Sequence, residues 1–563
     1  MNWKILDNVD EIKVAKLRKE VFDHEIIAKL LVQRGIEDFE SAKEFFRPDF
    51  NKLHDPFLMK DMDKAVARIE KAIEENQNIL VYGDYDVDGT TAVSLMYSFL
   101  KKQYPNVDVY IPDRYGEGYG ISFRGVDYAE EKDCSLIIAL DCGIKANDKV
   151  SYASDKNIDF IICDHHTPGD EIPDAIAVLD PKRKDDNYPF KELSGCGVGF
   201  KLAQAFSLKN NIDKSELNQH LDLVAVSIGA DIVSITGENR ILAHYGLKLL
   251  NSKPRAGFKA IMELYNKTEF SITDVVFKIA PRINAAGRMK HGKYAVRLMI
   301  QPDLDEARVQ SEKINEYNIS RKETDKQITT EALQQIIDNE DQNRFSNVVY
   351  GENWHKGVIG IVASRLIETY YKPTVVFTKS GDKLAASVRS VKGFDVYEAL
   401  TKCSEFIDQF GGHKYAAGLT ILEENYSKFR TKFEEVVKET ITEDSLHPEV
   451  LVSSEITLNQ IDVKFYNILK QFSPFGPGNM HPVFVARGLS DNGYGKQVGE
   501  DKTHLKLNII SAGDKRTFNS IGFGLGDKLE LVKNNGQFDA AFVIEENEWQ
   551  GNKSLQLSLR DIK

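Results

Sequence analysis

The chain has 563 residues, and its content of 42% hydrophobic and 28% charged residues is that of an ordinary globular protein. It contains no run of about eighteen apolar residues and no basic N-terminus followed by an apolar stretch, so we expect neither a membrane span nor a secretory signal. The formal net charge of −13 by itself argues against nucleic acid as a partner, because phosphate binding needs a basic surface.

The length, the cysteines and the local charge narrow the possibilities further. At about 100–200 residues per domain, the chain should contain about three to five domains. The five cysteines form no C-x-x-C pair and their number is odd, which argues against a disulfide framework or a zinc site and favours a reducing cytoplasm. The stretch 275–302 carries six Lys or Arg and no acid, which suits an anionic substrate bound at one place. A solvated basic surface is the alternative.

The first half of the chain predicts a layered α/β domain. Residues 1 to about 75 are expected to be helical. Short apolar strands then alternate with helical stretches, a pattern typical of a parallel sheet covered by helices. Sheets of this type bind their ligands outside the carboxyl ends of the strands. The expected strands are 79–82, 107–111, 135–140, 158–163 and 175–179.

The second half predicts three further parts. Residues 303 to about 340 are charged, lack glycine and proline, and have apolar residues at helical spacing, which predicts a long helix that bridges two domains. A second α/β unit follows, and the last part of the chain is strand-rich with repeated glycine turns, as in a small β-barrel. We expect an N-terminal helical part, a parallel-sheet domain, a connecting helix, a second α/β domain and a barrel over residues 1–75, 76–302, 303–341, 346–422 and 448–563.

The sequence VYGDYDVDGTTA over 81–92 places Asp84, Asp86 and Asp88 directly after a buried apolar run. A calcium loop of the EF-hand type also begins D-x-D-x-D-G, but it follows a helix and needs a glutamate at its twelfth position, where this chain has Leu95. A solvated acidic turn would explain the aspartates and the glycine. It would not explain why a strand directs a cluster of carboxylates to its own C-terminal end.

Other acids and imidazoles follow apolar runs in the same way, including the run 223–226, and we expect them at the same edge of the sheet: Asp141, His165, His166 and Asp231. Crowded carboxylates raise each other's pKa and lose solvation, so this gathering needs a counter-ion. Carboxylate with a minority of imidazole suits Mn²⁺ or Mg²⁺ rather than zinc. Two such ions about 3.5–4 Å apart form the usual arrangement for phosphoester cleavage.

These motifs resemble a known series. GDYDVDG, ALDCG, CDHH and GADIV are similar to the motifs of the DHH phosphoesterase superfamily. IPDRYGEGYG, LSGCGVGFKL, TGENR and APRINAAGRM resemble the members that degrade single-stranded DNA. WHKGVIGIVASRL, ASVRS and FGGHKYAAGL resemble the associated DHHA1 domain, and FSPFGPGN and DKTHLKL resemble an oligonucleotide-binding (OB) barrel. The implied fold class is α/β, with a parallel-sheet DHH domain joined by a long helix to an α/β DHHA1 domain, plus a C-terminal OB-type β-barrel.

The resemblance also implies roles for single residues. One metal ion would be held by Asp88, Asp141, His165 and Asp231. A second would be held by Asp86 and the bridging Asp141, with help from Asp84. The catalytic residues would be Asp141, His165 and His166, the last in contact with the scissile phosphate. The terminal 5′-phosphate would lie against Arg114, Ser387 and Arg389. Further nucleic-acid contacts would come from Arg282, Asn284, Arg288, His413, Lys502, His504 and Lys506.

Two positions depart from the pattern of the family. Tyr82 stands where several relatives have a histidine, which gives Asp84 a compensating role at the second metal site. Ala386 stands where the DHHA1 signature commonly has glycine, which bears on the local backbone geometry.

The implied activity is that of a single-stranded-DNA-specific 5′→3′ exonuclease that releases 5′-mononucleotides by two-metal hydrolysis with Mn²⁺ or Mg²⁺, in DNA repair and recombination. The resemblance further implies a cytoplasmic monomer that works with a helicase and a single-strand-binding protein and does not bind membranes. Two alternatives remain open. An oligoribonuclease or cyclic-dinucleotide phosphodiesterase would not need an extended single-strand platform such as the barrel. A non-catalytic DNA-binding scaffold would be expected to have lost its carboxylates, and here they are intact.

Overall fold

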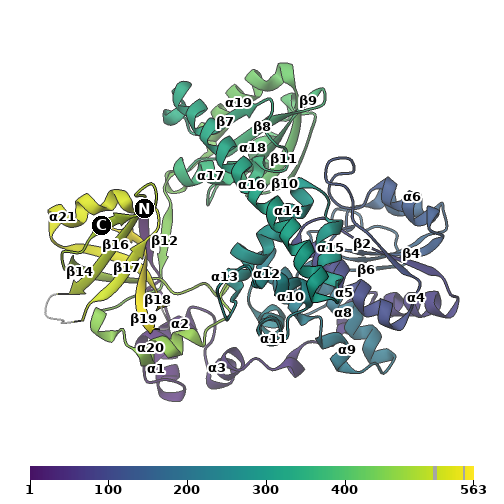
Figure 1. Ribbon diagram of the computed structural model, residues 1–563, viewed down its shortest axis with the longest axis horizontal. Coiled ribbons are helices and arrows are strands. Elements are labelled where there is room, and N and C mark those ends of the chain that lie inside the picture. Colours follow the sequence, from purple (N-terminus) through teal and green to yellow (C-terminus); the bar gives the residue numbers. More distant parts are fainter. Residues whose placement is uncertain (512–515, 550–551) are drawn as a thin grey trace. The chain divides into compact units, whose positions relative to one another are not determined.

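The computed structural model describes residues 1–511, 516–549 and 552–563 (Figure 1). The chain divides into two compact units. The motif unit, which carries the aspartate motif, comprises residues 7–318 and 459–482. The barrel unit comprises residues 1–6, 319–458 and 483–563. Among the described residues, no helix is long and apolar enough to cross a membrane.

A five-stranded sheet is the centre of the motif unit. Its strand order is β3-β2-β4-β5-β6, and every neighbouring pair is parallel. Apart from the edge strand β3, the strands are almost entirely buried, which is why they read as continuous apolar runs. The strands are β2 (Asn78–Gly83), β3 (Val107–Tyr110), β4 (Cys134–Leu140), β5 (Asp159–Cys163) and β6 (Ala177–Leu179), each close to its expected range.

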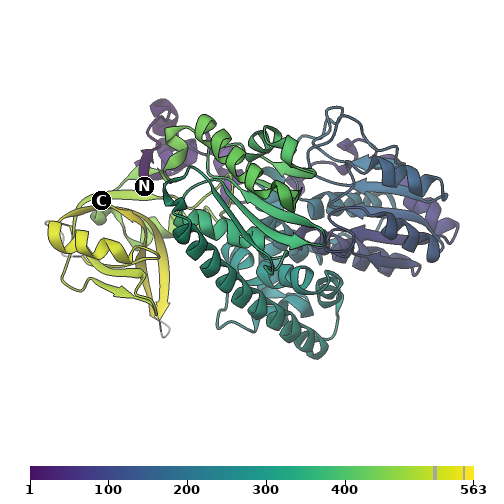
Figure 2. The same cartoon turned by 90° about the horizontal axis from the view of Figure 1, so that it is seen from above.

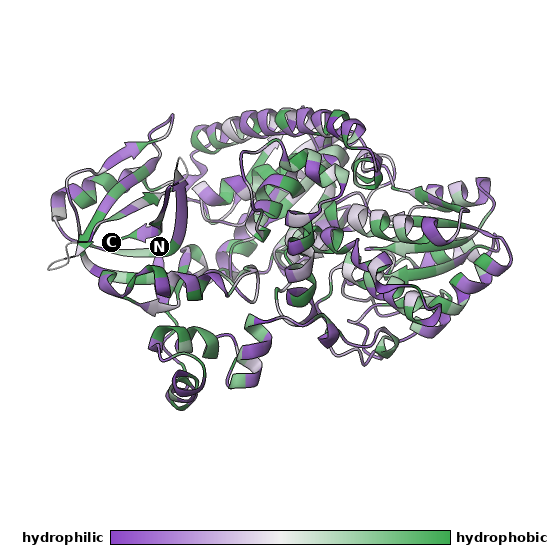
Figure 3. Ribbon diagram, turned by 60° about the horizontal axis from the view of Figure 1, so that its bottom comes forward, coloured by the Kyte–Doolittle hydropathy of each residue, from purple (hydrophilic) through white to green (hydrophobic). Residues whose placement is uncertain are grey.

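Two hydrophobic cores lie on the two faces of this sheet. Ile79 and Val81 of β2 belong to the larger core, and Leu80 and Tyr82 to the smaller one, as the period of two in a strand requires. Figure 3 shows the apolar strands covered by helices that carry both polar and apolar residues. The larger core includes residues of α4 (Met62–Glu74), α5 (Val87–Gln103) and α8 (Gly195–Lys209), and the smaller one residues of α6 (Phe123–Glu131) and α7 (Asn147–Ser154).

The rest of the motif unit is helical. The apolar run 223–226 is not a further strand but part of α10 (Leu221–Ala230). This helix is buried on every side over 221–229, so it has few of the polar positions by which a surface helix is recognised. The other helices are α1 (Glu11–Glu20), α2 (Glu25–Val32), α3 (Phe39–Phe46), α9 (Lys214–Asn218), α11 (Gly237–Ser252), α12 (Ala256–Met262), α13 (Ile272–Asp274), α14 (Ala280–Met289), α15 (Lys293–Ile300) and α20 (Val463–Lys470), with a π-helix over Val275–Ile279.

Helix α16 (Leu304–Asp338) is the connecting helix expected from the sequence. It has 35 residues, and the boundary between the two units falls within it, between residues 318 and 319. Figure 2 shows it as the long coil in dark teal. Its buried apolar residues recur at helical spacing and are Ala307, Ile314, Ile328, Ala332 and Ile336.

A mixed five-stranded sheet occupies residues 347–422 of the barrel unit. Its order is β10-β11-β9-β8-β7, and β7 and β8 form its parallel pair. This is the second α/β part expected from the sequence. Its elements are β7 (Asn347–Gly351), α17 (Ile359–Thr369), β8 (Thr374–Ser380), β9 (Lys383–Arg389), α18 (Val396–Thr401), β10 (Gln409–His413) and β11 (Ala416–Leu422), followed by α19 (Tyr426–Thr440).

Within the described residues, five strands close into a barrel in the C-terminal part. They pair in the order β14-β18-β19-β17-β16, and the pairing of β16 with β14 closes the ring. Closure removes the free edges that an open sheet would expose. The elements here are β13 (Ser454–Glu455), β14 (Phe484–Asp491), β15 (Lys496–Val498), β16 (His504–Ser511), β17 (Phe518–Gly522), α21 (Leu529–Asn535), β18 (Phe538–Trp549) and β19 (Asn552–Ile562).

Two short segments do not lie in the parts of the structure that were expected from the sequence. Strand β1 (Asn2–Ile5) pairs in parallel with β12 (Glu449–Val452) of the barrel unit, although residues 1–75 were expected to be helical. Residues 459–482 pack in the motif unit, where the Arg240 guanidinium donates to the Phe472 and Ser473 carbonyl oxygens. The fold class predicted from the sequence is nevertheless confirmed in all its parts.

Candidate metal centre and nucleic-acid interface

The aspartate motif lies at the carboxyl end of β2, where the chain turns into α5. Asp86 is the N-cap of α5, and its carboxylate accepts a hydrogen bond from the Gly89 backbone at 3.0 Å. Asp88 lies in the first turn of the helix and is buried. A Cβ added to Gly89 would lie 2.7 Å from the Asp84 backbone nitrogen. The glycine of the motif is therefore required by the tight turn that carries the aspartates.

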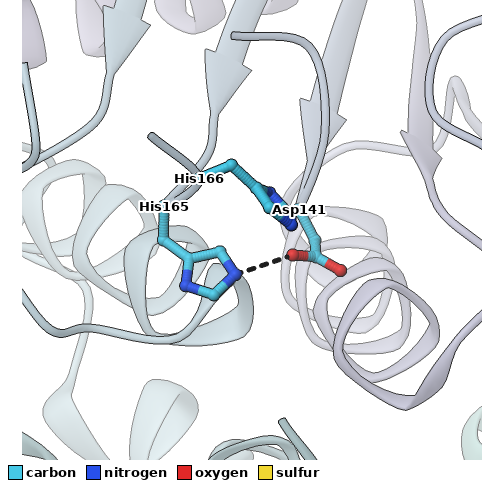
Figure 4. A group of neighbouring side chains, drawn as sticks. All are labelled: Asp141, His165 and His166. Carbon is cyan, nitrogen blue, oxygen red and sulfur yellow. Dashed lines mark ion pairs between the residues drawn. The ribbon is translucent and has the colours of Figure 1, made fainter. Parts of the chain in front are cut away.

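Three carboxylates converge on the His165 imidazole. Its Nε2 atom lies 3.2 Å from Asp141 Oδ1, 3.5 Å from Asp231 Oδ2 and 3.7 Å from Asp88 Oδ2. Figure 4 shows the His165 ring facing the Asp141 carboxylate below the ends of the strands. The four residues follow β4, β5 and α10 or lie at the start of α5. The structure thus brings together the set expected to hold one metal ion.

The atoms of this cluster lack the hydrogen bonds that buried polar groups normally make. Among the described residues, both oxygens of Asp141, both ring nitrogens of His165 and Oδ2 of Asp84 are buried without a hydrogen-bond partner. The short contact between His165 and Asp141 is therefore not a hydrogen bond. An unsatisfied buried group costs about 1–3 kcal/mol. A divalent cation would satisfy the Asp141 carboxylate and the His165 Nε2 atom that faces it, and the mixture of carboxylate and imidazole fits Mn²⁺ or Mg²⁺.

Burial and the charges of neighbouring aspartates oppose ionisation of the Asp141 and Asp231 carboxyl groups. Burial, with the charges of Asp88 and Asp86, holds the pKa of Asp141 well above its usual range. Burial and the neighbouring Asp88 raise the pKa of Asp231 to about 8. Burial also lowers the pKa of His165, which keeps its imidazole neutral. A metal ion binds imidazole in its neutral form, and its positive charge would favour ionisation of the neighbouring carboxyl groups. The protonation states favoured here are therefore those that suit a metal centre.

Asp88 is held by three hydrogen bonds. Its Oδ2 accepts from the Gly195 backbone at 2.7 Å, and its Oδ1 accepts from the Cys196 backbone at 2.8 Å and from the Ser227 hydroxyl at 2.7 Å. The start of α8 also favours a negative charge through the helix dipole. Ser227 Oγ also lies 2.6 Å from Ser194 Oγ, and because the Ser227 proton is directed to the carboxylate, Ser227 Oγ is the acceptor in this second contact. Sequence reasoning missed Ser227, because a serine 139 residues from its partner carries no local signal.

His166 is oriented by Asp164, the first residue of the D-H-H triplet. Its Nδ1 lies 2.7 Å from Asp164 Oδ1, which also accepts from the His166 backbone. Although burial opposes protonation, this hydrogen bond raises the pKa of His166 to about 9. The other ring nitrogen, Nε2, lies 3.3 Å from the Tyr119 hydroxyl. The contact of His166 with a scissile phosphate stays a prediction, and the structure adds Asp164 as the residue that orients its ring.

Tyr82 does not lie among the ligand candidates. Its hydroxyl donates to the Gly120 carbonyl oxygen at 2.9 Å and accepts from the Ser122 backbone at 3.1 Å. Asp84 binds the same loop, since its Oδ1 accepts from the Gly120 backbone at 3.2 Å. Tyr82 and Asp84 therefore fix the loop beside the cluster, and the role of Asp84 as a metal ligand stays a prediction.

Helix α14 packs against the aspartate motif, because a Cβ added to Gly287 would lie 2.8 Å from the Tyr85 carbonyl oxygen. It carries three of the expected nucleic-acid contacts, Arg282, Asn284 and Arg288. Arg282 is buried, and its guanidinium donates to the Tyr265 hydroxyl, so it also connects α14 to the segment that follows α12. The other two are partly exposed. All three stay predictions as DNA contacts.

Ser387 and Arg389 lie two residues apart on β9 beside the start of α17. A Cβ added to Gly360, in the first turn of α17, would lie 2.9 Å from Ser387 Oγ and 3.1 Å from Arg389 Nη2. A hydroxyl, a guanidinium and a helix N-terminus together suit a phosphate. Gly360 was missed from the sequence. Arg114 belongs to the motif unit, where its guanidinium lies 4.7 Å from the centre of the Tyr85 ring. The joint phosphate contact expected of these residues stays a prediction.

The barrel carries three expected contacts, Lys502, His504 and Lys506. Lys506 lies directly opposite Lys496 of β15, where like charges repel unless an anion is near. The exposed Phe523 ring lies 5.2 Å from the His504 ring. Basic residues beside exposed aromatic rings are typical of single-strand binding surfaces. Sequence reasoning missed Lys496 and Phe523. His413, the remaining expected contact, is exposed at the end of β10.

Comparison with known proteins identifies the domains of this chain. Models of the DHH family N-terminal domain, the DHHA1 domain and the RecJ OB domain match residues 78–228, 342–439 and 452–561. The single-stranded-DNA-specific exonuclease RecJ of Bacillus subtilis (strain 168) is 35% identical over 567 residues, covering 100% of this chain and 70% of that protein. This chain belongs to the RecJ family.

The likeness to other RecJ proteins extends over the chain. RecJ of Escherichia coli (strain K12) is 31% identical, with 95% of each protein covered. A crystal structure of RecJ in complex with Mn²⁺ from Thermus thermophilus matches with a TM-score of 0.86 at 25% identity, covering 100% of this chain and 79% of that chain. The family resemblance inferred from the motifs is therefore confirmed, and the chain has the RecJ fold.

Proposed function

We propose that this chain is a metal-dependent exonuclease that hydrolyses single-stranded DNA from its 5′ end. The observation that carries the proposal is the cluster of Asp88, Asp141, Asp231 and His165, whose ligand atoms are close together and in which Asp141 and His165 are buried without a hydrogen-bond partner. Relatives at 31–35% identity are named single-stranded-DNA-specific exonucleases, and a cluster of this kind suits phosphoester hydrolysis.

The residues of the cluster divide the work between them. Mn²⁺ or Mg²⁺ held by the two expected ligand sets would activate water and neutralise the charge that develops on the phosphate. Asp141 belongs to both sets and therefore fixes them relative to each other. Asp88 is aimed by its three hydrogen bonds, so it needs no rearrangement to bind. His166 has Nδ1 committed to Asp164, so its Nε2 is the atom that can donate to a phosphate oxygen when the ring is protonated.

Cleavage from the 5′ end requires that the enzyme recognise the terminal 5′-phosphate of the strand. A terminal phosphate carries more charge than an internal one and can accept from a guanidinium in a bidentate geometry. Ser387, Arg389 and the start of α17 place a hydroxyl, a guanidinium and a helix N-terminus side by side. In our proposal these groups hold the terminal phosphate, and Arg114 of the motif unit is a further contact to it. Each cleavage then releases one 5′-mononucleotide and leaves a new 5′-phosphate.

The two alternatives to this function are less well supported. A phosphodiesterase for dinucleotides would have no use for a closed barrel with basic and aromatic residues on one side. A non-catalytic scaffold would not need unsatisfied carboxylates in a buried cluster, which are costly unless they bind an ion. Both are tested by the same substrates.

We further propose a cytoplasmic monomer that acts in DNA repair and recombination together with a helicase and a single-strand-binding protein. All five cysteines are buried and free, which suits a reducing compartment. An enzyme limited to single strands depends on another activity to separate a duplex, which supports the helicase. Light scattering at several protein concentrations tests the monomer, and a duplex substrate with and without an added helicase tests the dependence.

The decisive test is digestion of a 5′-labelled and a 3′-labelled single strand with Mn²⁺, beside a duplex and a dinucleotide. We expect the 5′ label to be released first as a mononucleotide and the duplex to resist. Early release of the 3′ label would overturn the polarity. A preference for the dinucleotide would favour the small-substrate alternative, and the absence of cleavage with Mn²⁺ would favour the scaffold.

A further inference from the structure

Ile232, the residue directly after Asp231, combines an unusual backbone conformation with an exposed side chain. Its φ angle is +59°, in the left-handed region, and the residue is 65% exposed. It follows α10 and the cap residue Asp231, at the position where helices most often end with glycine or asparagine. A β-branched residue is strained there, because its Cβ comes too close to the following carbonyl oxygen.

The left-handed conformation at position 232 does not require isoleucine. Among the described residues, nine that are not glycine have a positive φ, and six of these are aspartate or asparagine, which tolerate the conformation. Ile232 is the β-branched member of the group. Glycine or asparagine would make the same turn with less strain. The isoleucine is therefore not explained by the backbone.

Neighbouring contacts hold this strained turn in place. On one side, the Asp231 backbone donates to the Ser227 carbonyl oxygen at 2.9 Å and ends α10. On the other, the Ile235 backbone donates to the Pro477 carbonyl oxygen at 2.7 Å, and Ile235 itself is buried. The conformation of Ile232 is thus imposed from both sides, as is usual for strained residues at functional sites.

Among the three carboxylate ligands expected around His165, the solvent-exposed one is Asp231, the residue before Ile232. The Asp231 side chain is 31% exposed, whereas those of Asp88 and Asp141 are 1% and 2% exposed. A substrate phosphate that reaches the cluster must come from solvent, so it meets Asp231 and its neighbour. Ile232 therefore exposes an apolar side chain directly after the most accessible of these carboxylates in the chain.

We propose that Ile232 packs against a nucleobase of the bound strand and so helps to seat the nucleotide whose phosphate is attacked. The proposal rests on the function proposed above. The face of a nucleobase is apolar, and covering it with an aliphatic side chain removes both surfaces from water. Every base offers such a face, so the contact improves binding without reading the sequence.

The test compares Ile232→Asn with a matched control, Ile12→Asn, on two substrates. Asparagine tolerates the left-handed turn but removes the apolar surface, and Ile12 is an 82% exposed isoleucine on α1. The substrates are a single strand and the same strand with abasic sites at its two 5′-terminal nucleotides. We expect Ile232→Asn to lower kcat/KM about 5- to 20-fold on the normal strand. On the abasic strand Ile232→Asn should match the wild type, and Ile12→Asn should match it on both.

Binding and stability complete the test. Binding is measured by fluorescence anisotropy in an Asp141→Ala background, so that the result does not depend on hydrolysis. In that background Ile232→Asn should raise the Kd for the normal strand and leave the Kd for the abasic strand unchanged. The thermal midpoint should rise slightly in Ile232→Asn, because the strain is relieved. Equal losses on both strands, no loss on either, or a lower midpoint would each overturn the proposal. If the wild type binds the strands with this preference but does not cleave them, the proposed activity fails and the base contact stands.

Discussion

Replacing Ser227 by alanine should weaken the metal centre without touching a metal ligand. The Ser227 hydroxyl supplies one of the three hydrogen bonds that orient Asp88. Both residues are buried, so water does not replace the lost bond. A hydrogen bond to a charged group contributes about 1.5–3 kcal/mol. We therefore expect the Kd for Mn²⁺ to rise about ten- to hundred-fold, the range seen when groups that orient metal ligands are removed. The backbone bonds from Gly195 and Cys196 remain, so the fold should survive.

The assay is titration of Mn²⁺ by isothermal calorimetry, with kcat/KM measured at low and at high Mn²⁺. Because the defect is in affinity, high Mn²⁺ should recover most of the activity of Ser227→Ala. The matched control is Ser207→Ala, which removes a buried serine hydroxyl that donates to the Ala203 carbonyl oxygen within its own helix. This control should lose some stability but bind Mn²⁺ normally. An unchanged Mn²⁺ affinity in Ser227→Ala would refute the view that Asp88 is a ligand held in place by Ser227.

Three other substitutions test separate parts of the structure. Asp141→Ala should abolish hydrolysis and Mn²⁺ binding while circular dichroism shows a folded protein, and near-normal cleavage would exclude Asp141 from the centre. Arg389→Ala should lower kcat/KM about ten- to hundred-fold on 5′-phosphorylated DNA, through a contact of about 1.5–3 kcal/mol, and much less on 5′-hydroxyl DNA. Equal losses would make Arg389 a general backbone contact. Burial and the nearby Arg255 lower the pKa of His220 to about 3, so the stability that depends on neutral His220 is full above about pH 6.5 and is lost as the pH falls towards 3. Between pH 7 and pH 5 the free energy of unfolding of the wild type should fall, and His220→Asn should make this fall smaller by about 2 kcal/mol. The measurement is the urea midpoint at the two pH values, and a fall in the variant as large as in the wild type would contradict the prediction.

Several features of this protein could be predicted from the sequence because their signals are local. Strands β2 and β4 are buried on both faces, so they appear as continuous apolar runs. The carboxyl ends of parallel strands share one edge, so Asp141 and His165 could be placed together before their distance was known. The long helix α16 showed itself by its spacing and its lack of glycine and proline. Asp231 was expected at the same place, but it arrives there from the end of a buried helix, whose pattern does not differ from that of a buried strand.

Other features were decided by the tertiary structure alone. The hydroxyl of Ser227 reaches Asp88 across 139 residues of sequence, and no periodicity or spacing encodes such a contact. The start of α17 meets Ser387 and Arg389 because β9 and α17 pack together. Residues 459–482 pack in the motif unit and not in the barrel unit, and backbone carbonyl groups of this segment accept hydrogen bonds from the Arg240 guanidinium. The left-handed turn at Ile232 depends on contacts that clamp the chain on both sides. In each case the cause is a long-range contact, which forms only when distant segments have already folded against each other.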